Sequence, residues 1–284
     1  MPDGDTFLLG GDLGVGRLGF GAMRITGDGI WGEPADPAAC RALLRHLVER
    51  GVNLIDTADS YGPDVSENLI AEALRPYPDN LVIATKGGLV RAGPNRWGPN
   101  GRPDHLKRAC EGSLRRLRVE RIDLYQLHRV DPKVPVEDSI GALVELQEEG
   151  KIRHLGVSNV SLEDLERAQQ IATVVSVQNR YNVIDRKSED VLRECERQQL
   201  AFFPWAPIAS GRDVAAHGPA VEEIARAHSA SSRQVALAWL LAHSPAIIPI
   251  PGTSTIAHFD ENLDAAGLEL EPEELAMLDD LAAP

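Results

Sequence analysis

Four ionisable side chains in the first half of the sequence have types and surroundings suited to proton transfer. Asp56 and Tyr61 share the segment DTADSYG, while Lys86 and His128 each end a short apolar run. A free phenol has a pKa near ~10 and is a weak acid at neutral pH, but a nearby cation favours its ionised form. We expect Lys86 to lower the pKa of Tyr61 in this way, with Asp56 keeping Lys86 charged and oriented. Together the four residues predict general acid–base chemistry.

Polar residues also end two later apolar runs: Ser158 and Asn159 follow one, and Gln178 ends the next. A single polar residue at a strand end is commonly a loop or cap residue. When several of them end parallel strands of one barrel, they meet at one mouth, where an acid, a base and an imidazole shift one another's pKa values. The pattern therefore predicts an active site at the carboxyl ends of the strands.

The elements that must position these residues alternate along the chain. Short apolar runs and longer amphipathic segments follow one another from Leu18 nearly to the C-terminus, which is the pattern of βα units in a parallel sheet. The runs predicted as strands are residues 18–21, 53–56, 81–86, 124–128, 154–158, 174–178, 201–205 and 246–250. Residues 105–117 and 136–149 have the apolar periodicity of helices, and Ser161 and Ser231 stand where helix N-caps are common.

Eight strands with intervening helices favour one α/β domain over residues 1–284, a closed (β/α)8 TIM barrel. A doubly wound sheet would need a GxGxxG phosphate-binding fingerprint after its first strand, and the sequence has none there. A cluster of glycines before the first strand predicts an N-terminal β-hairpin. Two long loops, residues 87–103 and 207–219, are expected to be functional, because barrel active sites are built from loops.

Composition disfavours several other classes of protein. The 284 residues are 43% hydrophobic and 25% charged, and no stretch approaches the ~20 apolar residues of a membrane helix. A net charge of −14 without a Lys/Arg cluster disfavours a nucleic-acid partner. The N-terminus lacks a basic region followed by an apolar core, which predicts a cytoplasmic protein. Cys40, Cys110 and Cys195 are predicted to be buried thiols, and no Cys or His has the spacing of a metal ligand.

The sequence resembles the aldo/keto reductases over nearly its whole length. The likeness is carried by GVNLIDTADSYG, VIATKGG, SLRRLRVERIDLYQLH, IRHLGVSN, VQNRYN and IPGTSTIAHFDENL, six motifs in the family's order and spacing. The resemblance implies reduction of a small-molecule carbonyl substrate by NAD(P)H. It implies that Tyr61 is the general acid, that Lys86 and Asp56 lower its pKa, and that His128 orients the substrate carbonyl.

The resemblance also implies a dinucleotide site. Ser158, Asn159 and Gln178 would bind the nicotinamide carboxamide, and Trp205 would stack on its ring. The residues implied near the nicotinamide ribose are Gly21, Ala22 and Met23, with Asp56 beside them. Those implied at the adenosine end are Gly252, Thr253, Ser254, His258, Glu261 and Asn262. Many relatives hold the 2′-phosphate with a Lys or Arg, where this sequence has Gly252, Ser254 and His258. We expect NADPH as the cofactor, with NADH as the alternative.

Within the family, RLGFGAMRITGDGIWGEP and YGPDVSENLIAEALRPY are most similar to the bacterial branch that includes pyridoxal reductases. This likeness indicates a small aldehyde such as pyridoxal as substrate. Trp31 and Trp97 lie in the loops after the first and third predicted strands, and they are candidate walls of the substrate pocket. The alternative is that both pack against the rim of the barrel.

Two other functions fit parts of the pattern. A Schiff-base aldolase on the same barrel would use Lys86 as its nucleophile. A non-catalytic regulatory subunit would keep the fold and the cofactor without turnover. The nucleotide-end motif at residues 252–262 disfavours the aldolase, and the complete set of Asp56, Tyr61, Lys86 and His128 disfavours the regulatory subunit. No feature of the sequence indicates an oligomeric state.

Overall fold

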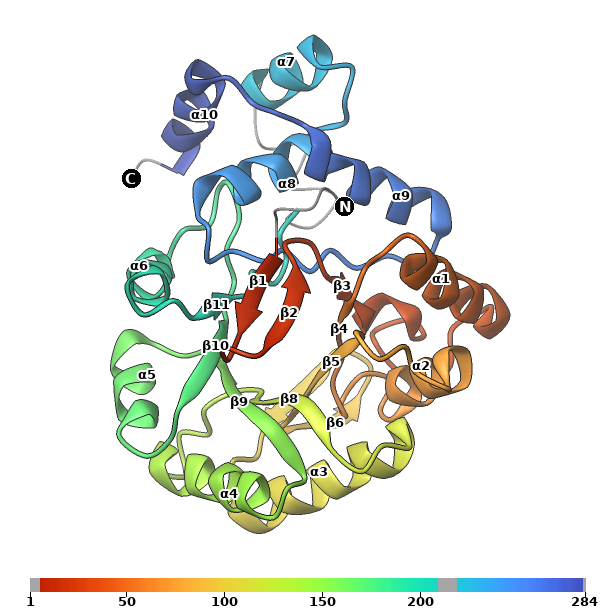
Figure 1. Ribbon diagram of the computed structural model, residues 1–284, viewed down its shortest axis with the longest axis vertical. Coiled ribbons are helices and arrows are strands. Elements are labelled where there is room, and N and C mark those ends of the chain that lie inside the picture. Colours follow the sequence, from red (N-terminus) through yellow and green to blue (C-terminus); the bar gives the residue numbers. More distant parts are fainter. Residues whose placement is uncertain (1–5, 209–218, 283–284) are drawn as a thin grey trace.

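The central element of the computed structural model, which describes residues 6–208 and 219–282, is a curled parallel sheet ringed by helices (Figure 1). Its strands lie in the order β11-β10-β9-β8-β5-β4-β3, and each pair of neighbours is parallel. They are β3 (Phe20–Gly21), β4 (Leu54–Asp56), β5 (Val82–Gly87), β8 (Ile122–Leu127), β9 (Ile152–Ser158), β10 (Val174–Gln178) and β11 (Ala201–Phe202). Seven of the eight predicted strands are therefore confirmed, with small shifts at their ends.

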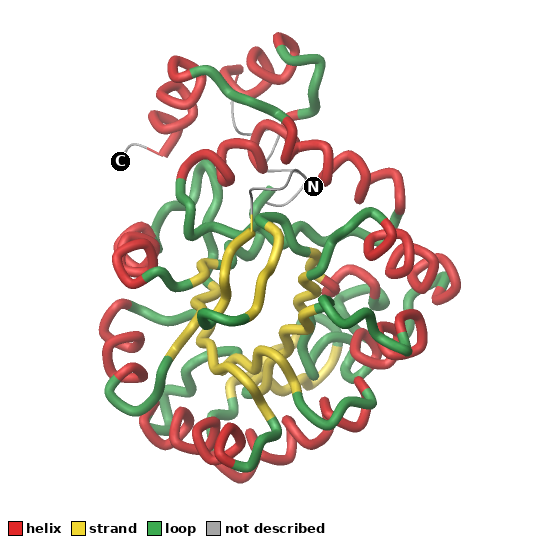
Figure 2. The backbone as a smooth tube through the Cα atoms, in the orientation of Figure 1, coloured by secondary structure: helices red, strands yellow, loops and turns green. Residues whose placement is uncertain are grey.

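Helices surround this sheet on its outer face (Figure 2). They are α1 (Pro37–Glu49), α2 (Val65–Leu74), α3 (Pro103–Leu117), α4 (Val136–Glu148), α5 (Leu162–Gln169), α6 (Glu189–Gln198), α7 (Pro219–Ala227), α8 (Ser232–His243), α9 (Ile256–Asp264) and α10 (Pro272–Asp279), with short 3₁₀ turns η1 (Ala22–Ile25), η3 (Ala265–Gly267) and η4 (Asp280–Ala282). The predicted N-caps Ser161 and Ser231 both form capping boxes, at the starts of α5 and α8. Within the described residues, no helix is long and apolar enough to cross a membrane.

The eighth predicted strand, residues 246–250, closes the ring without forming a regular strand. On one side its Ala246 carbonyl accepts a hydrogen bond from the N–H of Phe202 at 2.8 Å. On the other side the Pro249 carbonyl accepts one from the N–H of Gly19 at 2.9 Å. Proline has no N–H to donate, so Pro249 cannot complete a ladder with both neighbours. The backbone still joins β11 to β3, and the fold is a (β/α)8 barrel.

The predicted N-terminal hairpin is confirmed as β1 (Thr6–Leu9) and β2 (Leu13–Gly16), which lie across the amino end of the barrel (Figure 1). Gly10 and Gly11 have φ values of +61° and +84°, a conformation that favours glycine, so the turn forms there. The hairpin buries Leu9 and Val15 in the apolar interior of the barrel. The other side chains of that interior are Leu54, Val82, Ala84, Leu124, Val175, Ala201, Phe203, Ile248 and Ile250.

The first of the two long loops is not irregular throughout. Residues 87–103 contain an antiparallel hairpin of β6 (Leu89–Gly93) and β7 (Arg96–Pro99), which the sequence analysis treated as a loop. Asn95 in its turn has a φ of +53°, which Asn tolerates better than most residues. Residues 209–218 of the second loop lie outside the described residues.

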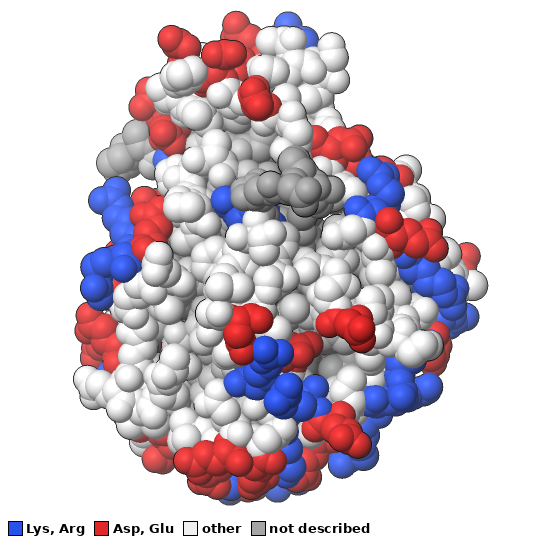
Figure 3. All heavy atoms as spheres, viewed as in Figure 1, with Lys and Arg blue, Asp and Glu red and all other residues white. Residues whose placement is uncertain are grey.

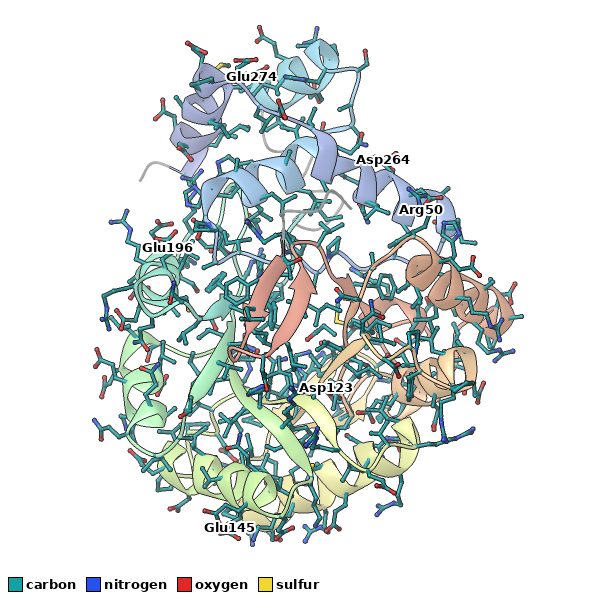
Figure 4. The ribbon with its side chains drawn as sticks, viewed as in Figure 1. Arg50, Asp123, Glu145, Glu196, Asp264 and Glu274 are labelled. Atoms are coloured by element: carbon teal, nitrogen blue, oxygen red, sulfur yellow. The ribbon has the colours of Figure 1, made fainter. Side chains whose placement is uncertain are left out.

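Ion pairs link neighbouring helices on the outer surface. Arg50, directly after α1, lies beside Asp264 of α9, with nitrogen and oxygen 3.9 Å apart (Figure 4). Glu274 of α10 pairs with His228, which follows α7, at 2.8 Å. Exposed pairs of this kind contribute little to stability individually. The helices α7 and α10 contact each other and lie together at one side of the barrel (Figure 1).

Candidate active site

Three of the four predicted catalytic residues come from adjacent strands. Asp56 ends β4, Lys86 lies near the end of β5, and His128 directly follows β8. These strands are hydrogen-bonded neighbours in the order β4, β5, β8, so their carboxyl ends open onto one mouth. Tyr61 follows β4 in the turn before α2 and joins this group. The structure thus brings all four residues together.

Lys86 is a fully buried cation at the centre of the site. Its Nζ donates to Asp56 Oδ2 at 2.7 Å and to the Thr57 carbonyl at 2.8 Å. Burial favours the neutral amine, but the Asp56 carboxylate and Tyr61 outweigh it and raise the pKa of Lys86 above its usual value. An ammonium held by two acceptors is a poor nucleophile, which argues against the Schiff-base aldolase.

Asp56 is held in place by two glutamines as well as by Lys86. Its Oδ1 accepts hydrogen bonds from Gln178 Nε2 at 2.8 Å and from Gln126 Nε2 at 3.3 Å. Gln178 was a predicted site residue, whereas Gln126 was not. Because Gln126 precedes His128 by two positions, it points to the same side of β8, and this alternation is the signal that could have found it.

Tyr61 is almost fully buried, with 6% of its surface exposed. The Lys86 Nζ lies 5.2 Å from the centre of its ring, and the His128 ring meets it edge-on at 5.8 Å. Burial raises the pKa of Tyr61 above 10 by more than Lys86 lowers it, and Asp56 adds to the rise. The predicted net lowering is therefore wrong. The phenol keeps its proton throughout the neutral range, as a proton donor must.

His128 is a neutral imidazole in this site. Burial, Lys86 and Arg129 together hold its pKa well below the usual value near 6.5. Its Nδ1 lies 3.4 Å from the Ser60 hydroxyl, in the turn that carries Tyr61. A neutral imidazole has one N–H to donate, which suits a group that orients a carbonyl oxygen without adding charge.

Asn159 connects several of the predicted cofactor residues. Its Nδ2 donates to the His128 carbonyl at 3.0 Å and to the Ser158 hydroxyl at 2.9 Å. Its Oδ1 accepts a hydrogen bond from Trp205 Nε1 at 3.2 Å and another from Arg129 at 3.1 Å. Asn159 has a φ of +57°, which turns the chain at the end of β9. Both ends of its amide therefore hold neighbouring groups, and one of these bonds sets the orientation of the Trp205 ring.

A second group of predicted cofactor residues lies between β3 and the segment that closes the barrel. A Cβ on Gly21 would lie 2.6 Å from the Ile250 carbonyl oxygen, and one on Gly252 would lie 2.7 Å from the Gly21 carbonyl oxygen. The two backbones approach so closely that only glycine fits. Ala22 and Met23 begin η1 directly after Gly21. The predicted ribose and adenosine contacts are thus adjacent in space although far apart in sequence.

Arg24 is a cation that the sequence analysis missed. It follows Met23 in η1, and its Cγ would lie 3.4 Å from a Cβ on Gly252. The contact joins residues more than two hundred positions apart, so no local pattern could reveal it. It places the Arg24 side chain beside Gly252, one of the predicted cofactor residues.

The adenosine end of the predicted site is the first turn of α9, which begins at Ile256. The Thr255 hydroxyl accepts a hydrogen bond from the His258 N–H at 3.4 Å and caps the helix. Ser254 and His258 are exposed, whereas Thr253 and Asn262 are buried. Glu261 lies 4.0 Å from Arg233 of α8. An exposed helix N-terminus with hydroxyl groups suits a phosphate ester, so these residues fit a dinucleotide.

Trp31 and Trp97 stand on either side of the Tyr61 turn. Trp97 of β7 meets the Tyr61 ring edge-on at 6.4 Å. Trp31 forms a parallel bridge with Gly62. Each tryptophan is 38% exposed. Both tryptophans therefore lie beside the turn that carries Tyr61.

Among the described residues, no group of three or more His, Cys, Asp or Glu side chains could hold a metal ion. A cavity of about 290 Å³ lies at the other end of the barrel, near the starts of β5, β8 and β9. Asp123, at the start of β8, lines it and points inward beneath the hairpin (Figure 4). No predicted site residue lines this cavity.

The carboxyl end of the barrel thus holds a tyrosine, a lysine, an aspartate and a histidine together. The model of the aldo/keto reductase family matches residues 17–283, and the chain belongs to that family. An uncharacterized oxidoreductase of Schizosaccharomyces pombe is 52% identical over 95% of this chain and 88% of its own length. Pyridoxine 4-dehydrogenase of Escherichia coli is 39% identical over 98% of both chains. The latter confirms the predicted likeness to the branch that includes pyridoxal reductases.

Solved structures show the same fold. An aldo/keto reductase of Klebsiella pneumoniae, solved with NADP and acetate, has a TM-score of 0.82 at 30% identity over 99% of this chain and 96% of its own. The glycerol dehydrogenase of Gluconobacter oxydans has a TM-score of 0.85 at 29% identity over 98% of this chain and 94% of its own. The chain is an oxidoreductase of this family and fold.

Proposed function

We propose that this protein reduces a small aldehyde to its alcohol with NADPH, and that Tyr61 donates the proton. The observation that carries the proposal is the buried Lys86–Asp56 pair beside a protonated Tyr61. The resemblance of the whole chain to the K. pneumoniae reductase solved with NADP supports the choice of cofactor.

Each residue at the mouth would have a separate role in the proposed reaction. Bound NADPH would supply a hydride to the carbonyl carbon. Negative charge then grows on the carbonyl oxygen, and Tyr61 would release its proton to that oxygen. As the proton leaves, the ammonium of Lys86 stabilises the phenolate, while Asp56 keeps Lys86 in place. His128, held neutral, would orient the carbonyl oxygen through an N–H.

The cofactor would lie across the two glycine-lined segments described above. Trp205 would stack on the nicotinamide, with Ser158, Asn159 and Gln178 near the carboxamide. Arg24 beside Gly252 would attract the phosphates, and the first turn of α9 with Ser254 and His258 would hold the 2′-phosphate. Backbone N–H groups and a helix N-terminus bind anions even on a protein of net charge −14.

Pyridoxal is the proposed substrate to test first. The E. coli relative is named pyridoxine 4-dehydrogenase, and pyridoxal is the aldehyde that corresponds to that alcohol at the same carbon. Trp31 and Trp97 beside Tyr61 offer flat apolar walls that suit a planar ring.

A carbonyl panel followed by NADPH absorbance tests the proposal. The panel contains pyridoxal, other aromatic aldehydes, aliphatic aldehydes and ketones, each with NADPH and with NADH. We expect turnover of at least one aldehyde, and its loss in Tyr61→Phe. Tight NADPH binding without turnover of any carbonyl would instead favour the non-catalytic regulatory subunit.

We also propose that residues 1–284 act as one barrel domain in the cytoplasm. Cys40, Cys110 and Cys195 are all free and buried thiols, which fits a reducing compartment. A single cooperative unfolding transition and recovery of the protein in the soluble cytoplasmic fraction are the expected results.

A further inference from the structure

Arg91 of β6 lies between the two tryptophans of the mouth. Its guanidinium carbon is 3.6 Å from the centre of the Trp97 ring and 5.7 Å from that of Trp31. The sequence analysis gave Arg91 no role, and the proposed reaction does not use it. Its planar cation nevertheless contacts both candidate walls of the substrate pocket.

The same guanidinium donates hydrogen bonds to main-chain carbonyls of three separate segments. Nη1 donates to Ile30 at 2.5 Å and to Ser60 at 2.9 Å. Nη2 donates to Gly29 at 2.8 Å and to Gly93 at 3.2 Å. Arg91 therefore ties the loop after η1 and the turn that carries Tyr61 to its own hairpin.

The segment that Arg91 holds on the Trp31 side is strained. Gly29 and Ile30 have φ values of +67° and +56°, and a β-branched residue such as Ile30 rarely adopts this conformation. The next residues dock on the catalytic turn, where the Gly32 N–H donates to the Gly62 carbonyl at 2.5 Å. The strained residue is Ile30, which keeps its conformation only while its surroundings hold it, and Arg91 bonds to its carbonyl and to that of Gly29.

An arginine is required for this arrangement. Its donors point in fixed directions in one plane and its faces stack on indole rings, whereas a lysine ammonium offers a point charge without a flat face. Burial lowers the pKa of Arg91, and among the described residues its partners are carbonyls and rings. Arg91 is thus a partly buried cation whose planar shape lets it bond to carbonyls and stack on rings at the same time.

We propose that Arg91 is a positioning residue that sets where Trp31 and Trp97 stand relative to Tyr61, and that it thereby makes the mouth selective for planar aromatic aldehydes over small aliphatic ones. This inference rests on the proposed carbonyl reduction. In the described structure no hydrogen bond joins Arg91 to the side chains of Tyr61, Lys86, Asp56 or His128, so its loss should affect a substrate that does not contact the two tryptophans less than one that does.

Arg91→Lys and Arg91→Ala test the proposal, with Arg17→Lys as the matched control. Arg17 also donates to three main-chain carbonyls, of Leu241, Ser244 and Ile247, but at the amino end of the barrel. Each protein is assayed for kcat and KM with pyridoxal and with propanal. NADPH affinity and thermal stability are measured beside them, and Arg91→Lys keeps the test informative where Arg91→Ala fails to fold.

We expect kcat/KM for pyridoxal to fall ~10-fold or more in both Arg91 variants, mainly through a higher KM. The reason is that a small displacement of Trp31 and Trp97 would weaken their contact with the planar ring. The value for propanal should fall less, because this substrate is affected only by release of the Ser60 carbonyl in the Tyr61 turn, and NADPH affinity should not change. Arg17→Lys should lower stability but leave the ratio between the two substrates unchanged.

The outcomes separate the two proposals. A wild type that turns over no carbonyl would sink the proposed function. A wild type that is active, with Arg91 variants that retain the pyridoxal-to-propanal ratio or that lose both substrates equally, would overturn the role of Arg91 alone.

Discussion

The two ends of the barrel are closed in different ways. At the carboxyl end, Asp56 and Lys86 are buried and joined at 2.7 Å, and neutral Tyr61 and His128 lie beside them. At the amino end, a hairpin covers an aliphatic interior. Figure 3 shows this face, where mostly uncharged atoms cover the centre and acidic and basic side chains gather below it. One of its ion pairs joins Asp12 and Arg153, at 2.6 Å.

Two acids at opposite ends of the strands show what this difference means. Asp56 has a buried cation as its partner. Asp123, at the amino end, accepts a hydrogen bond from the Ile83 N–H at 3.1 Å, and burial raises its pKa. A buried charge is stable only with a partner, and the carboxyl end supplies one. The buried pair of Lys86 and Asp56 thus distinguishes the carboxyl end, where we propose that the chemistry takes place.

Tyr61→Phe should have the largest effect on activity. Removing the phenol proton leaves the growing negative charge on the carbonyl oxygen without a donor, which costs ~10²–10⁴-fold in turnover. Affinity for NADPH should change little, because the hydroxyl acts only as the carbonyl is reduced. Steady-state assays and a binding titration measure the two quantities. Turnover close to the wild-type value would remove Tyr61 from the mechanism.

Lys86→Met and Asp123→Asn compare the two ends directly. Lys86→Met leaves Asp56 buried without its cation, so we expect loss of turnover together with ~3–5 kcal/mol of stability. Asp123→Asn keeps an acceptor for Ile83 at the other end and should retain turnover. Denaturant titrations and activity assays of both variants check this. Equal loss of activity in the two variants would contradict the division between the ends.

Asp59→Asn should change how stability depends on pH. Asp59 is buried beside the catalytic turn, and burial followed by the charge of Glu67 raises its pKa well above the usual value. The folded protein thus keeps a proton that the unfolded chain releases above pH ~4, so this contribution to stability is lost as pH rises towards the folded-state pKa. Asparagine does not titrate, so the Tm of Asp59→Asn relative to wild type should rise by ~2–4 °C between pH ~5 and ~8. A constant difference across that range would show that Asp59 is ionised in the folded protein.

Trp205→Ala should weaken cofactor binding by ~1 kcal/mol, the value of one aromatic stack. NADPH is expected to quench the fluorescence of the wild type, and most of that quench should disappear in the variant. Trp239, a buried residue of α8 that stacks on Tyr181, provides the background signal. A quench that persists in Trp205→Ala would assign it to another tryptophan.

The smallest effect concerns the choice between NADPH and NADH. Ser254→Ala and His258→Ala should each reduce the preference for NADPH by a few-fold, since each removes one of several groups near the proposed phosphate position. Arg233→Ala is the control. Arg233 lies beside Glu261, so this variant removes a positive charge near the site without removing a group proposed to contact the phosphate. Dissociation constants for both cofactors measure the preference. Equal binding of the two cofactors by the wild type would assign Ser254 to the ribose hydroxyl instead.

The strand ends of the site could be predicted from sequence because they follow a local pattern. Asp56, Lys86, His128 and Gln178 each end an apolar run, and parallel strands of a barrel bring such ends together. Ser161 and Ser231 marked helix starts through the spacing of the capping box. In these places local sequence and fold agree.

What the sequence analysis missed depends on contacts between distant segments or on burial. Arg24 meets Gly252 only in the folded barrel, and Arg91 acts through carbonyls that no side-chain pattern reveals. The pKa of Tyr61 is raised because its ring is deeply buried, and the spacing of residues in the sequence does not reveal that burial. Residues 246–250 do not form a regular strand because Pro249 has no N–H to donate. This matters only because the segment has a neighbour on each side.

Transfer of deuterium tests the central claim most directly. NADPH that carries deuterium at the reactive carbon of the nicotinamide is mixed with pyridoxal and protein, and the alcohol is analysed by mass spectrometry. We predict one deuterium in the product of the wild type and almost no product from Tyr61→Phe at equal cofactor saturation. An alcohol without deuterium, or a labelled product formed as fast by Tyr61→Phe as by the wild type, would contradict the claim.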